Sequence, residues 1–333
     1  MSLINGNAGR KSLKIFVTGA AGFIGCHLCR ALLGRGDRVL GLDNFDPFYP
    51  RAQKEDNLAF AAEGGPLEFV EGDIRDAAVL DRCLTAGDAP PDAVIHLAAL
   101  AGIQPSLADP LRFQDVNING TAQILEAMRR HGIRKFIFAS SSSVYGDNPK
   151  FPFQEDDPVD NPISPYAATK KAGELLTHVY HHLFGFAAHC LRFFTVYGPR
   201  QRPDLAIRKF AELMVAGRPV DIYGDGSQSR DFTYIEDIVA GLTASLERLA
   251  GYRVYNLGRG QVVSILNLVE LMGQAMGVEP NLVLTHRKPG DALRTCADIG
   301  RASLELGYRP AVSIAEGLER YIACLRLADK TEA

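Results

Sequence analysis

The chain has 333 residues, a net charge of −3 and 47% hydrophobic residues. Such a length can bury a large core and allows two domains. The charge balance lacks the general basic character of nucleic-acid-binding proteins, and no apolar stretch is long enough to span a membrane. We therefore expect neither a nucleic-acid partner nor a membrane partner. Residues 1–11 are polar and rich in glycine and asparagine, without an apolar signal region, which predicts a disordered lead.

The first predicted element is a buried strand over Lys14–Thr18, which leads through a glycine-rich turn into a helix that reaches Leu33. The glycines of this turn have one residue more between the first two than the usual dinucleotide fingerprint. They allow a tight bend, a close approach of a pyrophosphate and close packing of helix on sheet, while the helix N-terminus attracts phosphates. The predicted cofactor-binding residues of this segment are Gly19, Gly22, Phe23, Ile24 and Gly25.

A second predicted strand over 38–42 ends at Asp43, which is followed by Asn44. A carboxylate at this distance from the glycine turn accepts hydrogen bonds from the adenosine ribose and repels a 2′-phosphate, so NAD is favoured over NADP. The alternative is that Asp43 is an ordinary turn residue. Strand, glycine turn, helix, strand and terminal acid in this order predict a dinucleotide-binding fold.

Strand and helix signals continue to alternate as far as Arg192, which is typical of a parallel sheet with helices on both faces. The predicted fold class is α/β, a Rossmann-like doubly wound parallel sheet with a smaller mixed α/β lobe. We expect an NAD-binding domain over 12–192, with returns at about 231–257. A substrate lobe is expected over 193–230 and 258–328, with the substrate in the cleft between the two.

An apolar strand at 136–139 runs directly into four consecutive serines, Ser140–Ser143. Ligands of open α/β sheets bind at the carboxyl ends of the strands, where a serine hydroxyl can donate to the oxygen of a reacting alcohol or ketone. In isolation the run is equally compatible with a plain loop. Its place shortly before Tyr166 favours the catalytic interpretation.

Tyr166 and Lys170 stand four residues apart, just after Ser164 and Pro165, which are good N-cap and first-turn residues of a helix. On a helix these two side chains share one face. A free tyrosine has a pKa of about 10, and a fixed neighbouring ammonium group lowers it. The pair therefore predicts a tyrosine whose phenolate accepts a proton from an alcohol. Taken alone, the pair is also compatible with an ordinary surface helix.

Two other patterns are better explained by structural packing than by a redox or metal-binding role. Cys26 and Cys29 have C-x-x-C spacing inside the first helix, where a redox or zinc site would need partners. His178 and His181 lie on a later helix without a supporting carboxylate or cysteine pattern. We predict no metal site, and the cysteines fit reduced thiols in a cytoplasm.

With the glycine turn, the serine run and the Tyr166–Lys170 pair in this order, the chain resembles the extended short-chain dehydrogenases/reductases of the NAD-dependent epimerase/dehydratase family. The resemblance covers nearly the whole chain. Its more selective parts are two blocks, 191–200 and 229–234, which match segments that bind a nucleotide sugar.

The resemblance implies a role for each matched residue. Ser141 would be the catalytic hydroxyl, Tyr166 the base, and Lys170 both its tuner and a ribose contact. The further cofactor contacts that it implies are Asp73, Ile74, Leu97, Ala98, Ala99 and Asn117. The implied substrate contacts, with arginines for a diphosphate, are Ser142, Ser143, Thr195, Arg202, Tyr223, Arg230 and Asp291.

Within this family the chain most resembles the 4-epimerases that convert UDP-glucuronate to UDP-galacturonate through a transient 4-keto sugar. Related dehydratases place Asp-Glu, and decarboxylases a Glu, just after the catalytic hydroxyl, where this chain has Ser142 and Ser143. Gln104, a further substrate contact, replaces an arginine that epimerases of uronic acids usually carry. The alternatives are therefore a 4-epimerase of UDP-glucose or a UDP-N-acetylhexosamine, or another NAD-dependent nucleotide-sugar oxidoreductase.

The resemblance also bears on the oligomeric state. In this family, helices equivalent to 121–131 and 166–184 form a four-helix dimer interface, which implies a homodimer.

A regulatory protein that uses the fold as a sensor is another alternative, and the retention of Ser141, Tyr166 and Lys170 argues against it.

Overall fold

The structure is a computed structural model that describes residues 11–286, 290 and 292–331. Its centre is a seven-stranded sheet in the order β11-β6-β5-β4-β1-β2-β3, with every neighbouring pair parallel. The strands are β1 (Lys14–Thr18), β2 (Arg38–Asp43), β3 (Leu67–Glu71), β4 (Ala93–His96), β5 (Lys135–Ser141), β6 (Ala187–Phe193) and β11 (Tyr252–Leu257). The strand order reverses between β1 and β4, where doubly wound folds bind ligands. The predicted Rossmann-like sheet is confirmed.

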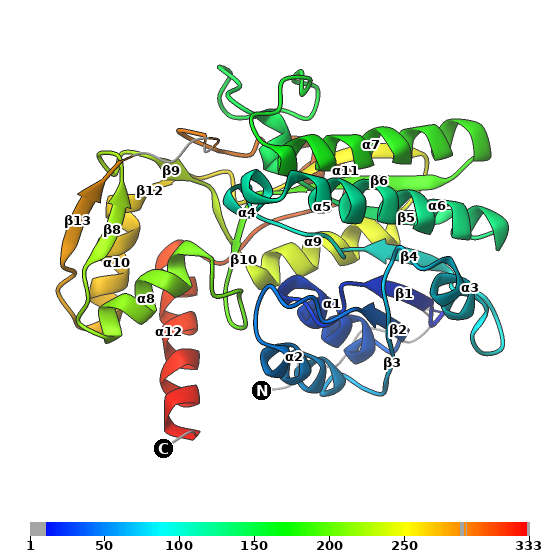
Figure 1. The fold of residues 1–333 in the computed structure, drawn as a ribbon, viewed down its shortest axis with the longest axis horizontal. Helices are drawn as coiled ribbons and strands as arrows, with labels where there is room; N and C mark the ends of the chain where they lie inside the picture. Colours follow the sequence, from blue (N-terminus) through cyan, green and yellow to red (C-terminus); the bar gives the residue numbers. More distant parts are fainter. Residues whose placement is uncertain (1–10, 287–289, 291, 332–333) are drawn as a thin grey trace.

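Helices cover both faces of this sheet (Figure 1). The helices of one face are α1 (Phe23–Gly34), α2 (Arg51–Ala62) and α9 (Ile235–Glu247), and those of the other are α3 (Ala77–Thr85), α5 (Pro110–Gln114), α6 (Gly120–Arg130) and α7 (Pro165–Phe184). Successive side chains of a strand point to opposite faces, so β1 contributes to two cores. Ile15 and Val17 join the core of α1 and α9, whereas Phe16 joins that of α3 and α6.

The second lobe stands at the left of Figure 1. Its elements are α8 (Ala206–Val215), β8 (Val220–Tyr223), α10 (Ile265–Met276), β13 (Leu282–Thr285) and α12 (Ile314–Thr331). Strand β8 pairs in parallel with β13, and α10 packs against α8 and α12. The remaining short elements are α4 (Ile103–Ala108), η1 (Asp115–Asn119), η2 (Ser142–Tyr145), β7 (Thr195–Tyr197), β9 (Ser229–Arg230), β10 (Phe232–Tyr234), β12 (Val263–Ser264) and α11 (Gly300–Glu305).

The predicted elements agree with the structure to within a few residues. The helix expected at Tyr166 begins at Pro165, and Ser164 is its N-cap because its hydroxyl accepts a hydrogen bond from Ala167 N at 3.2 Å. Strand β11 pairs with β6, so the chain returns to the main sheet after the first part of the second lobe. The division into 12–192 with returns and 193–230 with 258–328 stays a prediction. Residues 1–10 of the expected disordered lead lie outside the described residues.

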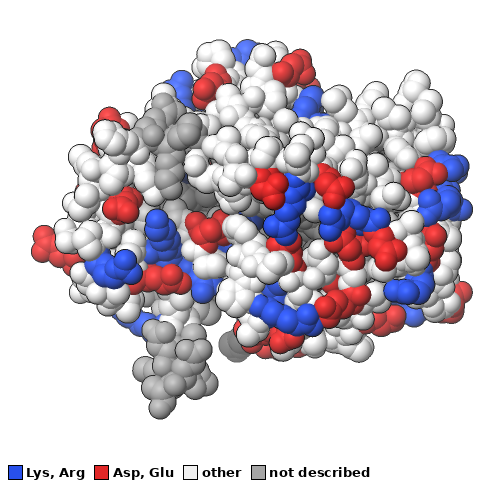
Figure 2. Space-filling model, in the orientation of Figure 1, with Lys and Arg blue, Asp and Glu red and all other residues white. Residues whose placement is uncertain are grey.

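Charges on the face seen in Figure 2 are mixed, because basic and acidic side chains lie next to one another. Among the described residues, no helix has the length and apolarity that a membrane crossing requires. Cys26 and Cys29 are buried in α1, and burial raises the pKa of Cys26 to about 12, as expected for cysteines that pack rather than react. No group of three potential metal ligands occurs within the part of the chain that the structure describes.

Candidate active site

A cavity of about 1010 Å³ is lined by residues from both lobes and by the segments that follow β1, β2, β4 and β5. It brings together most of the residues predicted from the sequence. These residues are Gly19, Gly22, Phe23, Ile24, Gly25, Asp43, Asn44, Ile74, Leu97, Ala98, Ala99, Gln104, Ser141, Ser142, Ser143, Tyr166, Lys170, Thr195, Arg202, Tyr223 and Arg230. Asp73 and Asn117 are not among the lining residues but hydrogen-bond to the lining residues Asn44 and Leu100, and Asp291 lies outside the described residues. The individual roles stay predictions.

The glycine turn has the geometry that a bound pyrophosphate needs. Gly19 has φ +74°, and a Cβ there would lie 2.7 Å from Ala98 N. A Cβ on Gly25 would lie 2.0 Å from Gly19 O, so only glycine lets α1 approach this closely. Gly22 caps α1 without a side-chain hydrogen bond to its first N–H groups. Helix N–H groups of this kind fit the phosphates of a dinucleotide.

Asp43 makes the turn contact of one interpretation and leaves the other, ribose binding, as a prediction. Its Oδ1 atom accepts from Phe45 N at 2.9 Å, as in a turn, and its Oδ2 atom accepts from Ala21 N of the glycine turn at 3.2 Å. Burial raises the pKa of this carboxyl group, and the Lys54 ammonium, 3.9 Å away, opposes that shift. Lone pairs remain on the carboxylate for ribose hydroxyls, so the turn interpretation does not exclude the ribose interpretation.

Ser141 and Tyr166 meet where the sheet edge faces the catalytic helix. Ser141 ends β5, and its Oγ atom accepts from Ser143 N and donates to Ser143 Oγ, both at 3.1 Å. Tyr166 lies in the first turn of α7, with its ring edge-to-face against Phe113 at 6.3 Å between centroids. A hydroxyl and a phenol therefore line the same stretch of the cavity.

The expectation that Lys170 lowers the pKa of Tyr166 is wrong for the ligand-free protein. The Lys170 Nζ atom lies 6.0 Å from the Tyr166 ring centroid and donates to Ala139 O at 2.8 Å. Burial raises the pKa of Tyr166, and the Ser141 hydroxyl and the Arg202 charge only oppose this shift. Burial also lowers the pKa of Lys170 to about 7, so near neutral pH the lysine is only partly charged.

Asn117 supports the site from a π-helical turn, η1, a distortion that is frequent at functional sites. Its Oδ1 atom accepts from Leu100 N at 2.8 Å, and its Nδ2 atom donates to Leu100 O and Thr169 Oγ1, both at 3.0 Å. Leu100 follows the cavity-lining segment 97–99, and Thr169 precedes Lys170 on α7. Asn117 therefore fixes the cavity wall to α7.

Sequence reasoning missed a buried ion pair behind the serine run. Glu174 on α7 accepts from the Nε and Nη2 atoms of Arg192 on β6, both at 2.9 Å, and from Ser140 Oγ at 2.6 Å. Both charged side chains are almost completely buried. The signal was visible in the sequence, because Arg192 is the one arginine in a strand of mostly apolar residues.

Two arginines, Arg202 and Arg230, also line the cavity. The Arg202 guanidinium pairs with Asp204 at 2.8 Å and lies 5.4 Å from the Phe48 ring centroid. Arg230 donates to Ser229 O at 2.9 Å, and its side chain lines the cavity. Arginines that line a cavity suit an anionic group such as a diphosphate.

A Rossmann sheet whose glycine turn shares a cavity with a serine, a tyrosine and a lysine defines a dinucleotide-dependent enzyme of alcohol–ketone oxidation and reduction. The chain belongs to the NAD dependent epimerase/dehydratase family, whose model matches residues 15–258.

Among its relatives is a UDP-glucuronate 4-epimerase of Thermodesulfobacterium geofontis, 42% identical over 92% of this chain and 94% of that protein. The crystal structure of the UDP-glucuronic acid 4-epimerase from Bacillus cereus, in complex with UDP-glucuronic acid and NAD, is 39% identical. It has a TM-score of 0.89 over 95% of this chain and 100% of its own. A UDP-N-acetylglucosamine 4-epimerase from Methanobrevibacter ruminantium is 32% identical, with a TM-score of 0.86 over 96% of this chain and 100% of its own.

Proposed function

We propose that the protein is an NAD-dependent 4-epimerase that converts UDP-glucuronate to UDP-galacturonate through a 4-keto sugar. The observation that carries this function is that Ser141 and Tyr166 line one cavity together with the glycine turn and the arginines of the second lobe. The relative of known structure that binds UDP-glucuronic acid and NAD supports the choice of substrate and cofactor.

When bound, NAD⁺ would supply the hydride acceptor and a positive charge near the phenol. With that charge favouring its phenolate form, Tyr166 would take the O4 proton and become a neutral phenol as the C4–H bond breaks, and Ser141 would donate a hydrogen bond that holds O4 in position. Arg202 and Arg230 bind the diphosphate, which anchors the sugar far from the reacting carbon. A 4-keto ring that turns about this anchor presents its opposite face, and Tyr166 returns the proton to O4 as the C4–H bond re-forms.

The positions next to the catalytic hydroxyl argue against dehydration and decarboxylation. Ser142 and Ser143 form η2 and line the cavity at the places where those reactions would need a carboxylate. Gln104, which also lines the cavity, can hydrogen-bond a sugar carboxylate without neutralising it. A 4-epimerase of an uncharged UDP-hexose is therefore the second candidate, and Gln104 is the observation that favours it.

The test is to incubate the purified protein with UDP-glucuronate, UDP-glucose and UDP-N-acetylglucosamine in parallel and to separate the products by chromatography. We expect an epimer of equal mass from UDP-glucuronate, without added reductant and without net NADH absorbance. Conversion of an uncharged sugar alone would establish the second candidate instead. A product lighter by water or carbon dioxide would contradict epimerisation.

The homodimer is also proposed here. Leu175, Val179 and Leu183 form an exposed apolar stripe along α7, with exposed fractions of 55%, 43% and 62%. Residues four apart share one helix face, and a second copy of α7 would cover it. The cytoplasmic location stays a prediction, which six free cysteines support.

A further inference from the structure

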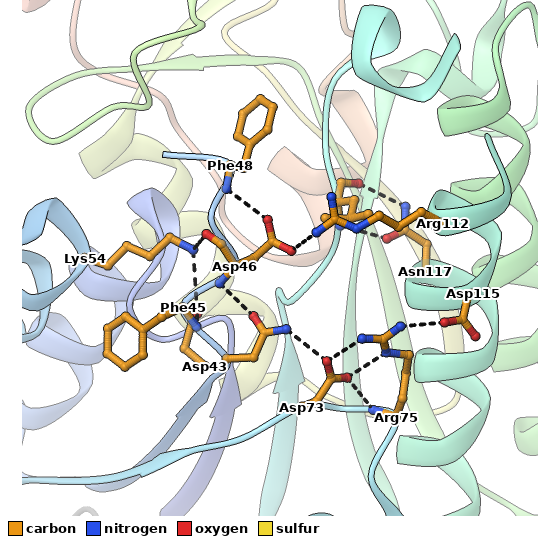
Figure 3. Close-up of polar contacts among 12 residues, drawn as sticks. Asp43, Phe45, Asp46, Phe48, Lys54, Asp73, Arg75, Arg112, Asp115 and Asn117 are labelled. Carbon is orange, nitrogen blue, oxygen red and sulfur yellow. Dashed lines mark hydrogen bonds and ion pairs between the residues drawn. The ribbon is translucent and has the colours of Figure 1, made fainter. Parts of the chain in front are cut away.

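We propose that Asp46 and Arg112 form an ion pair that bridges the cofactor crevice and retains NAD through the catalytic cycle. This inference rests on the proposed function, because it concerns a dinucleotide in that crevice. The Nη2 group of Arg112 donates to Oδ2 of Asp46, and both residues line the cavity (Figure 3).

The pair joins segments that stand on opposite sides of β1. Asp46 follows β2, and Arg112 lies on α5, which follows β4. In the sheet, β2 and β4 are the two neighbours of β1, and the glycine turn begins where β1 ends. The bridge therefore spans the carboxyl end of β1, from which the glycine turn begins. A dinucleotide that extends from Asp43 to Tyr166 must pass this bridge.

The Asp46 side of the bridge is held in place by its own neighbours. Its Oδ1 atom accepts from Phe48 N at 3.1 Å, and its carbonyl oxygen accepts from Lys54 Nζ at 2.8 Å (Figure 3). Since Arg112 is half-exposed on a long side chain, it is the part of the bridge that can swing away.

A second chain of polar contacts links the same two sides. Asn44 Nδ2 donates to Asp73 Oδ2 at 3.0 Å, and Arg75 contacts both oxygens of Asp73, at 2.9 and 2.7 Å. Arg75 also donates to Asp115 in η1, three residues beyond Arg112 (Figure 3). Two links instead of one hold the segment after β2 against the segment after β4.

The partial exposure of the pair limits its strength. The Asp46 and Arg112 side chains are 17% and 47% exposed, and ion pairs of this kind add little to folding and weaken in salt. If the bridge must break before NAD leaves, it slows release by up to about fivefold, which corresponds to about 1 kcal/mol.

Retention matters because the hydride taken from C4 must return to the same carbon. If the reduced cofactor left early, the sugar would remain oxidised by two electrons. Each abortive turnover would release one 4-keto UDP-sugar, one NADH and one proton, and the protein would need a new NAD⁺.

The test measures NAD release from the wild type and from Arg112→Ala and Asp46→Asn. Each protein is loaded with radiolabelled NAD, freed of unbound label and diluted into excess unlabelled NAD. We expect release about fivefold faster in both variants. Salt should accelerate release more in the wild type than in the variants, because the variants keep only the second link. Combining Asp46→Arg with Arg112→Asp should restore slow release.

The matched control is Arg51→Ala. Arg51 is 52% exposed and pairs with Glu55 and Glu71, and it is not among the residues that line the cavity. Release from Arg112→Ala that is no faster than release from Arg51→Ala overturns the bridge. A wild type that retains no labelled NAD overturns the proposed function as well, so the two failures are distinguishable.

Discussion

At the scale of single residues, the chemistry depends on how Lys170 is charged. Its ammonium group donates to Ala139 O and lies 5.2 Å from the Phe138 ring centroid, on a side chain that is almost fully buried. Burial disfavours the charged form and lowers the pKa to about 7. A hydrogen-bond acceptor that enters the site, such as a ribose hydroxyl, would favour the charged form again.

This lowered pKa makes stability depend on pH. In the unfolded chain Lys170 regains a pKa of about 10.4, so between pH 7 and pH 10 the unfolded state binds more protons than the folded state. The stability of the NAD-free protein therefore rises with pH across this window, by about 2 kcal/mol between pH 7 and 9. Lys170→Met should lack this rise. Urea unfolding of both proteins at the two pH values measures it, and parallel changes would contradict the lowered pKa.

At the scale of elements, the pair of Glu174 and Arg192 ties α7 to β6, and Ser140 adds the end of β5. Arg192 also donates to Glu155 O at 3.1 Å, and its guanidinium lies 4.8 Å from the Tyr145 ring centroid. The helix that carries Tyr166 is thus fixed to the strand that carries Ser141. Because both charges are buried, each needs the opposite charge of the other to offset the cost of its removal from water.

Glu174→Gln should therefore destabilise the protein strongly. The change keeps the shape of the side chain and leaves the Arg192 cation buried without its carboxylate. We expect a loss of about 3–5 kcal/mol in unfolding free energy. Glu212→Gln is the control, because Glu212 pairs with Arg208 in an exposed position and should cost less than about 1 kcal/mol. Urea denaturation compares them, and equal losses would refute this role of the pair.

The sequence predicted the elements well because their signals are local. Strand β1 follows from its apolar run, and α7 begins where Ser164 and Pro165 place it. The shared cavity followed from a topological rule, since carboxyl ends of parallel strands meet at one edge.

The electrostatics of the site escaped prediction because they depend on tertiary environment. The spacing of Tyr166 and Lys170 indicated a shared face but not the depth of burial, which sets both pKa values. Asp46 and Arg112 are 66 residues apart in the chain, and no local pattern signals their contact.

At the scale of the whole molecule, the exposed stripe of α7 is the feature that a monomer does not explain. Leu175, Val179 and Leu183 follow one another at intervals of four on the helix that carries Tyr166 at its start. Removing apolar surface of this kind from water stabilises the assembly by about 25 cal/mol per Å². A second copy that covers the stripe would also brace the catalytic helix.

Val179→Glu should therefore convert the proposed homodimer into a monomer. A carboxylate at the centre of the stripe would face its own copy across the interface, and burying such unpaired charges is strongly unfavourable. Analytical ultracentrifugation at micromolar concentrations gives the mass of each form. Leu304→Glu is the control, because Leu304 is 87% exposed on α11, a helix other than the one that carries the stripe, and its variant should stay dimeric. A wild type that sediments as a single chain, or a Val179→Glu variant that stays paired, would rule out this interface.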